Sequence, residues 1–421
     1  MPAPLVVINT VGLTSRLLQY APRLSALAKA GWCIPMRETL PAVTCTAQAT
    51  MLTGVPPNKH GIVANGWLYR DTNEVRFWQQ SNRLIQAEPV YATAKRRAAK
   101  RGRELKVAKL FWWFNQGADV DISVTPKPHY GIDGSKVFDV AVMPWLLGFD
   151  VKHELGSFPF ASFWGPLSGI KSTQWIAALT ALTLRKAPLN LLFTYLPHLD
   201  YDPQRHGPSG CNIATQVGML DDQCQHILDA AERLGARVWI VNEYCHRDVT
   251  TPVFLNRFLA GGDIVAERKG PFGSRVDLFD GWGFVVCDHQ IAHIYVWKPE
   301  HISIAELIAK QPGVDRVFIG EQRAEIGLDH PRSGEIIALA KPDAWFAYPF
   351  WLDDRDAPDY ARTVAIHHKP GFDPCELFFD PKIRFPKLRV ARKLLQSKLG
   401  FRTKFDVIPL DASIVRGSQT A

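Results

Sequence analysis

Short apolar runs alternate with helical stretches along most of the chain. Seven runs rich in β-branched or aromatic residues predict buried strands, at 5–9, 191–196, 237–244, 284–288, 293–297, 316–320 and 335–340. Between the second and third runs, the spacing of apolar residues predicts a helix over 213–234 that ends at Gly235. A strand, helix and strand in this order are typical of a βαβ unit. We therefore expect an α/β fold with a largely parallel central sheet flanked by helices.

Residues 66–170 interrupt this rhythm with aromatic stretches punctuated by proline, such as LFWWFNQG and FPFASFWGP. Because open α/β sheets bind ligands at the carboxyl ends of their strands, we interpret this segment as an inserted cap over that edge. Additional core is the plainer alternative. The predicted organisation is a first part of the core at 1–65, the cap at 66–170, a second part of the core at 171–380 and a basic tail at 381–421.

The composition is that of a globular protein. With 47% hydrophobic and 21% charged residues, global disorder is excluded. No window approaches 18 consecutive apolar residues, and the first residues lack the features of a signal peptide. The seven cysteines are scattered and form no CxxC pair, which argues against a disulfide framework or a cysteine-based zinc site. These features together predict a cytoplasmic protein with reduced thiols.

The formal net charge of +8 is unevenly distributed. The run at 382–404 carries nine cations and no acid, and its interleaved leucines predict an amphipathic helix. Docking on the chain's own core is the expected role of this helix, and peripheral contact with a membrane surface is the alternative. Since charged runs are most often solvated helix faces, no nucleic-acid polymer is expected as a partner.

The stretch TCTAQATMLTG predicts a helix that begins near Thr44 and closes at Gly54. A hydroxyl at a helix start faces unpaired backbone N–H groups and the positive end of the helix dipole, which favour an alkoxide or a phosphate oxygen. That position suits a nucleophile beside an oxyanion hole. A threonine there is more often only a helix cap, so the position alone does not establish catalysis.

A longer pattern around this helix carries a family resemblance. Its fixed positions are Pro41, Thr44, Ala49, Thr50, Thr53, Gly54, Pro57, His60, Gly61, Ile62 and Asn65. The pattern resembles the alkaline phosphatase superfamily, and within it the type I phosphodiesterase and nucleotide pyrophosphatase family. The resemblance implies a parallel-sheet core flanked by helices and a threonine nucleophile, here Thr44, beside two metal ions that are usually zinc.

The metal-binding motifs of that family are altered in this chain. Where the family's first strand ends in a metal-binding Asp, this sequence has Val11. The next motif keeps Asp200 but has Gln204 in place of a histidine. In the motif after the strand at 237–244, Glu243 stands for an aspartate and Tyr244 for a histidine.

The last family motif resembles IHHKPGFDP, which would supply His367 or His368 as a ligand. The resemblance thus implies a metal set of Asp200, Gln204, Glu243 and one late histidine. Zinc favours imidazole, thiolate and carboxylate ligands, whereas a glutamine carbonyl suits harder cations. We therefore expect one divalent ion rather than two, with Zn²⁺, Mg²⁺, Mn²⁺ and Ca²⁺ all open.

Polar side chains near these motifs are candidates for substrate contact. They are Cys45, Asn65, His206, Tyr244, His289 and His293. In a strand, His289 and His293 would lie on the same face because side chains alternate with a period of two. For a single histidine, a structural role with a satisfied hydrogen bond is the more ordinary interpretation.

Two functional hypotheses follow. The first is a metal-dependent, phosphodiesterase-like hydrolase of a small phosphate or phosphonate ester, with Thr44 as nucleophile. The alternative is a catalytically altered pseudoenzyme, or a metabolite-binding protein of a biosynthetic pathway, on the same scaffold. The altered ligands keep both open, because a fold does not carry its chemistry with it.

Overall fold

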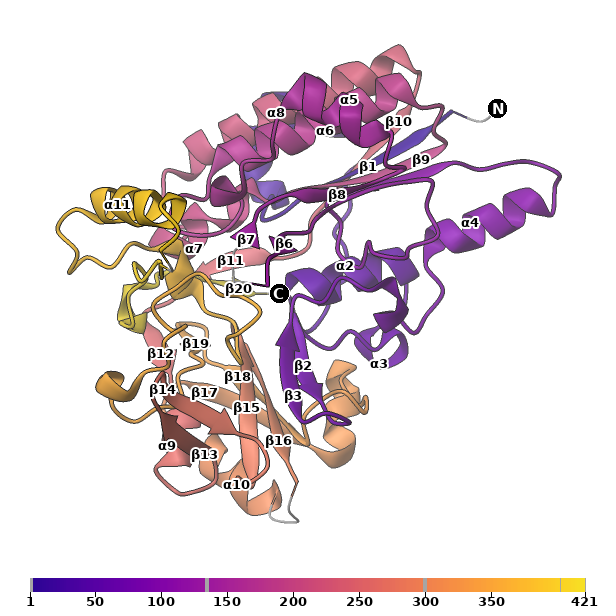
Figure 1. Cartoon of the computed structure of the whole chain (residues 1–421). Coiled ribbons are helices and arrows are strands. Elements are labelled where there is room, and N and C mark those ends of the chain that lie inside the picture. Colours follow the sequence, from indigo (N-terminus) through magenta and orange to yellow (C-terminus); the bar gives the residue numbers. More distant parts are fainter. Residues whose placement is uncertain (1–2, 133–135, 298–300, 402, 421) are drawn as a thin grey trace.

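A six-stranded sheet forms the centre of the molecule (Figure 1). The computed structural model describes residues 3–132, 136–297, 301–401 and 403–420. The strand order is β10 (Arg237–Val241), β1 (Leu5–Thr10), β9 (Leu191–Leu196), β4 (Val107–Leu110), β5 (Ile122–Pro126) and β8 (Val140–Met143). All neighbours are parallel except β8, which runs antiparallel to β5. The expected α/β fold with a largely parallel central sheet is confirmed.

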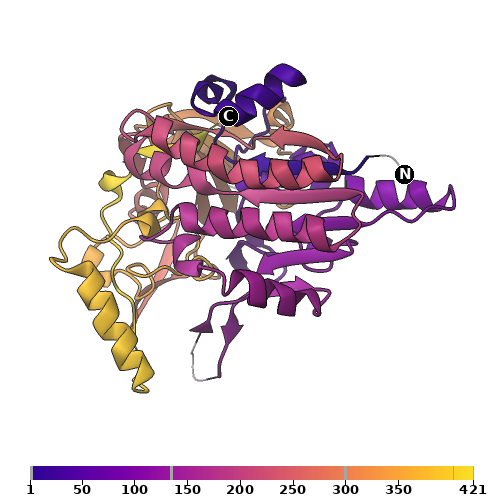
Figure 2. The same ribbon diagram turned by 90° about the horizontal axis from the view of Figure 1, so that it is seen from above.

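Helices cover this sheet because its middle strands are apolar on both faces. All six residues of β9 and five of the six in β1 are buried. The long helices α6 (Ile170–Lys186) and α8 (Ile213–Arg233) lie side by side over one face, and α1 (Pro22–Ala30) packs against α8 (Figures 1 and 2). The helix predicted over 213–234 is α8, and it connects β9 to β10 as expected.

Four of the predicted strands form a second sheet. They are β15 (Gly283–Asp288), β16 (Ile291–Val296), β18 (Ile336–Ala340) and β17 (Val314–Ile319), in this order, and every pair is antiparallel. Two residues, His289 and Gln290, join β15 to β16. So short a connection allows only a hairpin, which excludes these strands from the parallel sheet.

The segment at 66–170 supplies β4, β5 and β8 to the central sheet, so this part of it is core rather than cap. Its other elements are β2 (Gly66–Tyr69), β3 (Glu74–Phe77), α4 (Val90–Ala99), β6 (His129–Tyr130), β7 (Lys136–Val137) and α5 (Leu147–Leu155). The sequence conceals β4 because Lys109 lies in its middle. Lys109 is fully buried, and its Nζ donates to the Phe114 carbonyl oxygen at 2.9 Å.

The predicted helix after Pro41 is α2 (Thr44–Thr53), and it ends at Gly54 in the left-handed conformation with φ +70°. The loop that follows contains α3 (Pro57–His60), and the buried side chain of His60 holds this loop against α2. The His60 ring lies 2.9 Å from Thr50 Oγ1 and accepts from the Ile62 amide at 3.1 Å. Burial lowers the pKa of His60 to about 4, so the neutral ring bridges the helix and the loop.

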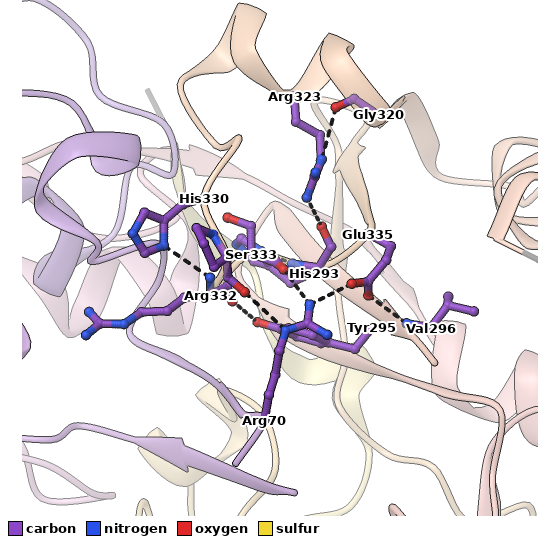
Figure 3. A network of polar contacts seen from close by, with 12 residues as sticks. Arg70, His293, Tyr295, Val296, Gly320, Arg323, His330, Arg332, Ser333 and Glu335 are labelled. Atoms are coloured by element: carbon purple, nitrogen blue, oxygen red, sulfur yellow. Dashed lines mark hydrogen bonds and ion pairs between the residues drawn. The ribbon is translucent and has the colours of Figure 1, made fainter. Parts of the chain in front are cut away.

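Two arginines connect this loop to the second sheet. Arg332 donates to the carbonyl oxygens of Gly61 and Leu84, both at 2.7 Å. Arg70, which follows β2, forms an ion pair of 2.7 Å with Glu335, whose other oxygen accepts from the Val296 amide of β16 (Figure 3). These contacts fix the position of the α2–β2 region against the β15–β18 sheet.

A buried carboxylate makes a third connection between the same two regions. Asp288 ends β15 and accepts from the backbone amide of Asn65 at 2.8 Å and from its side-chain amide at 3.1 Å. Asn65 in turn accepts from the Cys45 amide in the first turn of α2 at 2.9 Å. The second sheet therefore positions the start of α2.

The C-terminal part of the chain returns to the central sheet. After α11 (Pro386–Lys398), the last strand, β20 (Gly417–Thr420), pairs antiparallel with β11 (Cys245–Asp248), which follows β10. The remaining elements are α7 (Asp202–His206), β12 (Thr251–Val253), α9 (Leu255–Ala260), β13 (Ala266–Gly270), β14 (Gly273–Asp277), α10 (His301–Ala309) and β19 (Ala344–Phe346). Among the described residues, no helix combines the length and apolar composition needed to cross a bilayer.

The fit of β20 is tight enough to test. A Cβ added to Gly417 would lie 1.9 Å from the Pro203 carbonyl oxygen, so Gly417→Ala must displace the strand. We expect a loss of about 1–3 kcal/mol in the free energy of unfolding, measured by urea titration. Gly218→Ala is the matched control, because Gly218 lies in α8 with open space around it and should gain about 0.5–1 kcal/mol. Equal stability of the Gly417→Ala variant and the wild type would contradict this packing.

The buried Asp288 predicts a pH dependence of stability. Burial raises its pKa from 3.8 to about 7, so the folded state holds this proton more tightly than the unfolded state. Stability should therefore fall as the pH rises between these two values, by at most about 4 kcal/mol. Glu243, whose pKa burial raises to about 8, should add a decline of its own.

Unfolding free energies measured at roughly pH 5 and roughly pH 8 test this expectation. The Asp288→Asn variant should lose the part of the decline that belongs to Asp288, whereas Asp280→Asn, at an exposed position, should keep it. An unchanged decline in the Asp288→Asn variant would show that Asp288 is not the titrating group.

Candidate functional site

The candidate site lies where the carboxyl ends of β10, β1 and β9 meet, the edge at which open α/β sheets place their ligands. Thr44 begins α2 there and is 3% exposed. Its Oγ1 lies 3.0 Å from the hydroxyl of Tyr244, which follows β10. The first amide that the helix itself engages is that of Ala47, which donates to the Val43 carbonyl oxygen; in the turn before it, the Cys45 amide donates to Asn65 Oδ1.

Asp200 is the centre of the polar cluster around Thr44. Its Oδ1 lies 3.2 Å from the Tyr244 hydroxyl, 3.0 Å from His246 Nε2 and 2.9 Å from Gln419 Nε2. Gln419 Nε2 also lies 2.8 Å from the Tyr244 oxygen. A single carboxylate oxygen thus accepts from three side chains, which come from the segment after β10, from β11 and from β20.

Glu243 is held separately by side-chain amides. Its Oε1 accepts from Asn9, at the end of β1, and from Gln48 Nε2 of α2 at 2.6 Å. Gln48 is oriented by the Trp113 amide, which donates to its Oε1 at 2.7 Å. Burial raises the pKa of Glu243 to about 8, and its Oε2 has no hydrogen-bond partner among the described residues. The uncharged acid is therefore well populated at neutral pH.

Several of the predicted residues are brought together. Thr44, Asp200, Glu243 and Tyr244 form the cluster, with Cys45 and Asn65 hydrogen-bonded at the start of α2. Gln204 is buried beside it, but its side chain turns to the Asp200 backbone, where Nε2 donates to the carbonyl oxygen at 2.8 Å. The Gln204 side chain therefore stabilises the turn around Asp200.

The predicted histidines lie elsewhere. His206 is exposed at the end of α7, and His367 and His368 are exposed in the loop before Gly371. His367 Nδ1 lies 3.2 Å from the Phe77 carbonyl oxygen. In the described part of the chain, no three His, Cys, Asp or Glu side chains are grouped so that they could hold a metal ion.

His289 and His293 do not share a strand face, because His289 lies in the β15–β16 turn with φ +60°. His289 Nδ1 lies 3.3 Å from the Gln419 amide, and its ring stacks on Phe372 at 4.0 Å, so it contacts the segment that reaches Asp200. His293 faces the other way, with Nε2 3.1 Å from the Val63 carbonyl oxygen. Burial lowers the pKa of both rings.

The last family motif has a structural role here. Lys369 is buried between Asp373 and Glu376, with Nζ–O distances of 2.7 and 2.8 Å. The Trp164 indole donates to Glu376 at 2.6 Å. The two carboxylates stabilise the charged form of Lys369 against its burial, and its pKa is raised. Asp373, which matches a position of the family motif, thus stabilises this loop.

Sequence reasoning did not single out Asn9, Gln48 or Gln419. Asn9 stands at the carboxyl end of the first strand, and Gln48 lies one turn after Thr44. Both residues could therefore have been recognised from the sequence as neighbours of the site. Gln419 had none, because it reaches Asp200 only through the pairing of β20 with β11.

These residues do not fit the two-zinc centre that the resemblance implies. Zinc ligands are oxygen, nitrogen or sulfur atoms whose lone pairs point at the ion. Here Asp200 Oδ1 accepts from a phenol, an imidazole and an amide, and Glu243 Oε1 accepts from two amides. The retained carboxylates therefore act as hydrogen-bond acceptors.

The fold is shared with solved enzyme structures of low sequence identity. Murine ectonucleotide pyrophosphatase/phosphodiesterase 5 is 15% identical, with a TM-score of 0.56 over 84% of this chain and 82% of that one. Phosphonoacetate hydrolase from Sinorhizobium meliloti 1021, in complex with phosphonoformate, is 13% identical, with a TM-score of 0.55 over 82% of each chain. At these identities the likeness establishes the fold.

Two further complexes show what these proteins bind. An inactive variant of the murine protein is in complex with AMP (14% identity, TM-score 0.56, 85% of this chain and 82% of that one). The hydrolase is also in complex with phosphonoacetate (13% identity, TM-score 0.55, 85% and 84%). A comparison with curated protein sequences finds no match. The sequence model described as type I phosphodiesterase / nucleotide pyrophosphatase matches residues 5–373, so the chain belongs to that family.

Proposed function

We propose that this chain binds a small phosphate or phosphonate ester at the start of α2. We further propose that its altered site no longer catalyses the hydrolysis that is typical of the family. The observation that carries the proposal is that one oxygen of Asp200, Oδ1, accepts from Tyr244, His246 and Gln419. The protein is then a phosphoester-binding member of a family of hydrolases.

Binding is supported by the chemistry of the helix start. The dipole of α2 and the first-turn amides other than that of Cys45, which Asn65 engages, favour an anionic oxygen, and the Thr44 hydroxyl can donate to it. The Asn65–Asp288 pair fixes this turn from the second sheet. AMP and phosphonoacetate, bound by the structural relatives, define the ligand class to examine first.

The proposed loss of hydrolysis follows from a lack of positive charge around the transferring phosphoryl group. A transferring phosphoryl group carries negative charge that two divalent ions would compensate, and such compensation contributes several kcal/mol in the transition state. The groups that contact Asp200 and Glu243 are amides, a phenol and an imidazole. A loss of about 4 kcal/mol slows a reaction on the order of 10³-fold.

A Thr44-dependent hydrolase is the second candidate, and one observation favours it. Thr44 Oγ1, the Tyr244 hydroxyl and Asp200 Oδ1 form a continuous chain of hydrogen bonds. As the Thr44 oxygen bonds to phosphorus, the P–O bond to the ester's alcohol would break and release that alcohol. The Thr44 proton would pass to the Tyr244 oxygen while the Tyr244 proton passes to Asp200. Burial holds the pKa of Tyr244 well above its ordinary value, so the phenol acts only as a relay.

Binding and turnover measured on the same preparations separate the two candidates. Calorimetry with AMP and with phosphonoacetate should show binding of at least one of them, weakened about tenfold by Thr44→Val through the lost hydrogen bond. Hydrolysis of these compounds and of an aryl phosphodiester should be equally low in the wild type and the Thr44→Val variant.

The matched control is Thr53→Val at the other end of α2, where the hydroxyl only returns to the Ala49 carbonyl oxygen. This variant should bind like the wild type. Turnover that depends on Thr44 but not on Thr53 would replace the binding proposal with the hydrolase. No binding of either ligand together with no turnover would contradict both.

The position of Gln419 predicts that it competes with the ligand. Thr44 is almost fully buried, and the Gln419 amide donates to Asp200 and to Tyr244, the two groups of the hydrogen-bond chain that begins at Thr44. We therefore propose that a ligand there displaces the Gln419 side chain. Removing these donors by Gln419→Ala should raise ligand affinity roughly tenfold, since each hydrogen bond contributes about 1 kcal/mol. Calorimetry is the measurement, and Gln311→Ala, at a helix end far along the sequence, is the control. Weaker binding by Gln419→Ala would mean that Gln419 contacts the ligand instead.

A further inference from the structure

We propose that α11 docks the protein on an anionic lipid surface, a property beyond the proposed phosphoester site. The helix is attached to the body by its polar side. Arg389 and Lys393 pair with Asp406, the latter at 2.6 Å, and Val390 packs on the small core beneath. No residue of α11 is buried.

The apolar side of α11 faces outward. Leu388, Leu395 and Leu399 recur at intervals of seven and four residues, which places them on one helix face, and they are 67%, 59% and 66% exposed. The residues that contact the body are Arg389, Val390 and Lys393. They lie on the side of the helix opposite the leucine stripe. The expected docking of this helix on the chain's own core is met by Val390 but not by the leucines, so the leucine stripe is available to a partner.

Charge selects the kind of partner. Lys387 and Lys398 flank the leucine stripe on one side and Arg392 on the other, and all three are exposed. None of them lies within ion-pair distance of a carboxylate in the described part of the chain. An exposed leucine stripe between two rows of cations matches the boundary between acyl chains and anionic headgroups, where long basic side chains reach the phosphates.

A second exposed apolar group lies on the same side of the molecule. Figure 2 shows α11 and the β6–β7 hairpin projecting toward its lower edge, while α5 lies along the body. From the last residue of β8 into α5, Met143, Trp145, Leu146 and Phe149 are each more than half exposed. Tryptophan is preferred at the membrane interface, and phenylalanine and leucine suit the apolar face of an interfacial contact, so this group is a second candidate for contact with lipid.

Vesicle flotation with the full chain tests the proposal. The wild type should float with phosphatidylcholine vesicles that contain phosphatidylserine, and the bound fraction should fall as salt is raised, because screening weakens charge attraction. Phosphatidylcholine vesicles alone should bind much less. The absence of flotation with the anionic vesicles would overturn the proposal.

Three sets of variants locate the contact. In the Leu388→Asp/Leu395→Asp variant, partitioning onto the vesicles should fall at least about tenfold. Changing the cation at 387, 392 or 398 to glutamine should lower partitioning roughly fivefold for each change. Trp145→Asp should weaken binding as well, and an unchanged result would remove the second apolar group from the docking face. Leu234→Asp, at the exposed end of α8, is the matched control and should bind like the wild type.

Because the leucines are exposed, these variants should fold, which an unchanged thermal midpoint would verify. Light scattering examines the competing occupant of the stripe, a second copy of the chain. Equal flotation of the wild type and the double aspartate variant would overturn the proposal. A dimer that is lost in that variant, without lipid binding, would do so too.

Discussion

The site depends on one carboxylate, Asp200, whose Oδ1 accepts hydrogen bonds from Tyr244, His246 and Gln419. These donors come from the segment after β10, from β11 and from β20, so the interaction joins Asp200 at the carboxyl edge of the sheet to Gln419, 219 positions further along the chain. A buried carboxylate must be compensated by cations or by hydrogen bonds. In this chain hydrogen bonds do so, and the chemistry available to Thr44 follows from that choice.

Two separate parts of the chain contribute to the site around Thr44 and Asp200. The second sheet positions the start of α2 through Asp288 and Asn65, while the C-terminal segment brings Gln419 to Asp200. That segment also carries α11, whose leucine stripe faces outward. The proposed lipid-docking helix and the strand that supplies Gln419 are thus parts of one stretch of chain, although each proposal rests on its own contacts.

Much of the fold was predictable because local patterns determine it. The apolar runs of β1 and β9, the helix α8, and the helix from Thr44 to Gly54 follow from residue spacing and end signals. The pairing of strands was not predictable, since the antiparallel hairpin at His289 and the buried Lys109 of β4 depend on contacts between distant residues. In the site, the family pattern indicated Thr44, Asp200, Glu243 and Tyr244, but it could not show that β20 supplies Gln419.

The most direct test of this account is a calorimetric titration of the purified, metal-stripped wild type and its Asp200→Asn variant with zinc. Because the Asp200 oxygen already accepts from three side chains, the account predicts that neither protein has a tight, stoichiometric zinc site and that their titrations coincide. One or two tightly bound ions in the wild type, lost in the Asp200→Asn variant, would contradict it and restore the metal-dependent hydrolase.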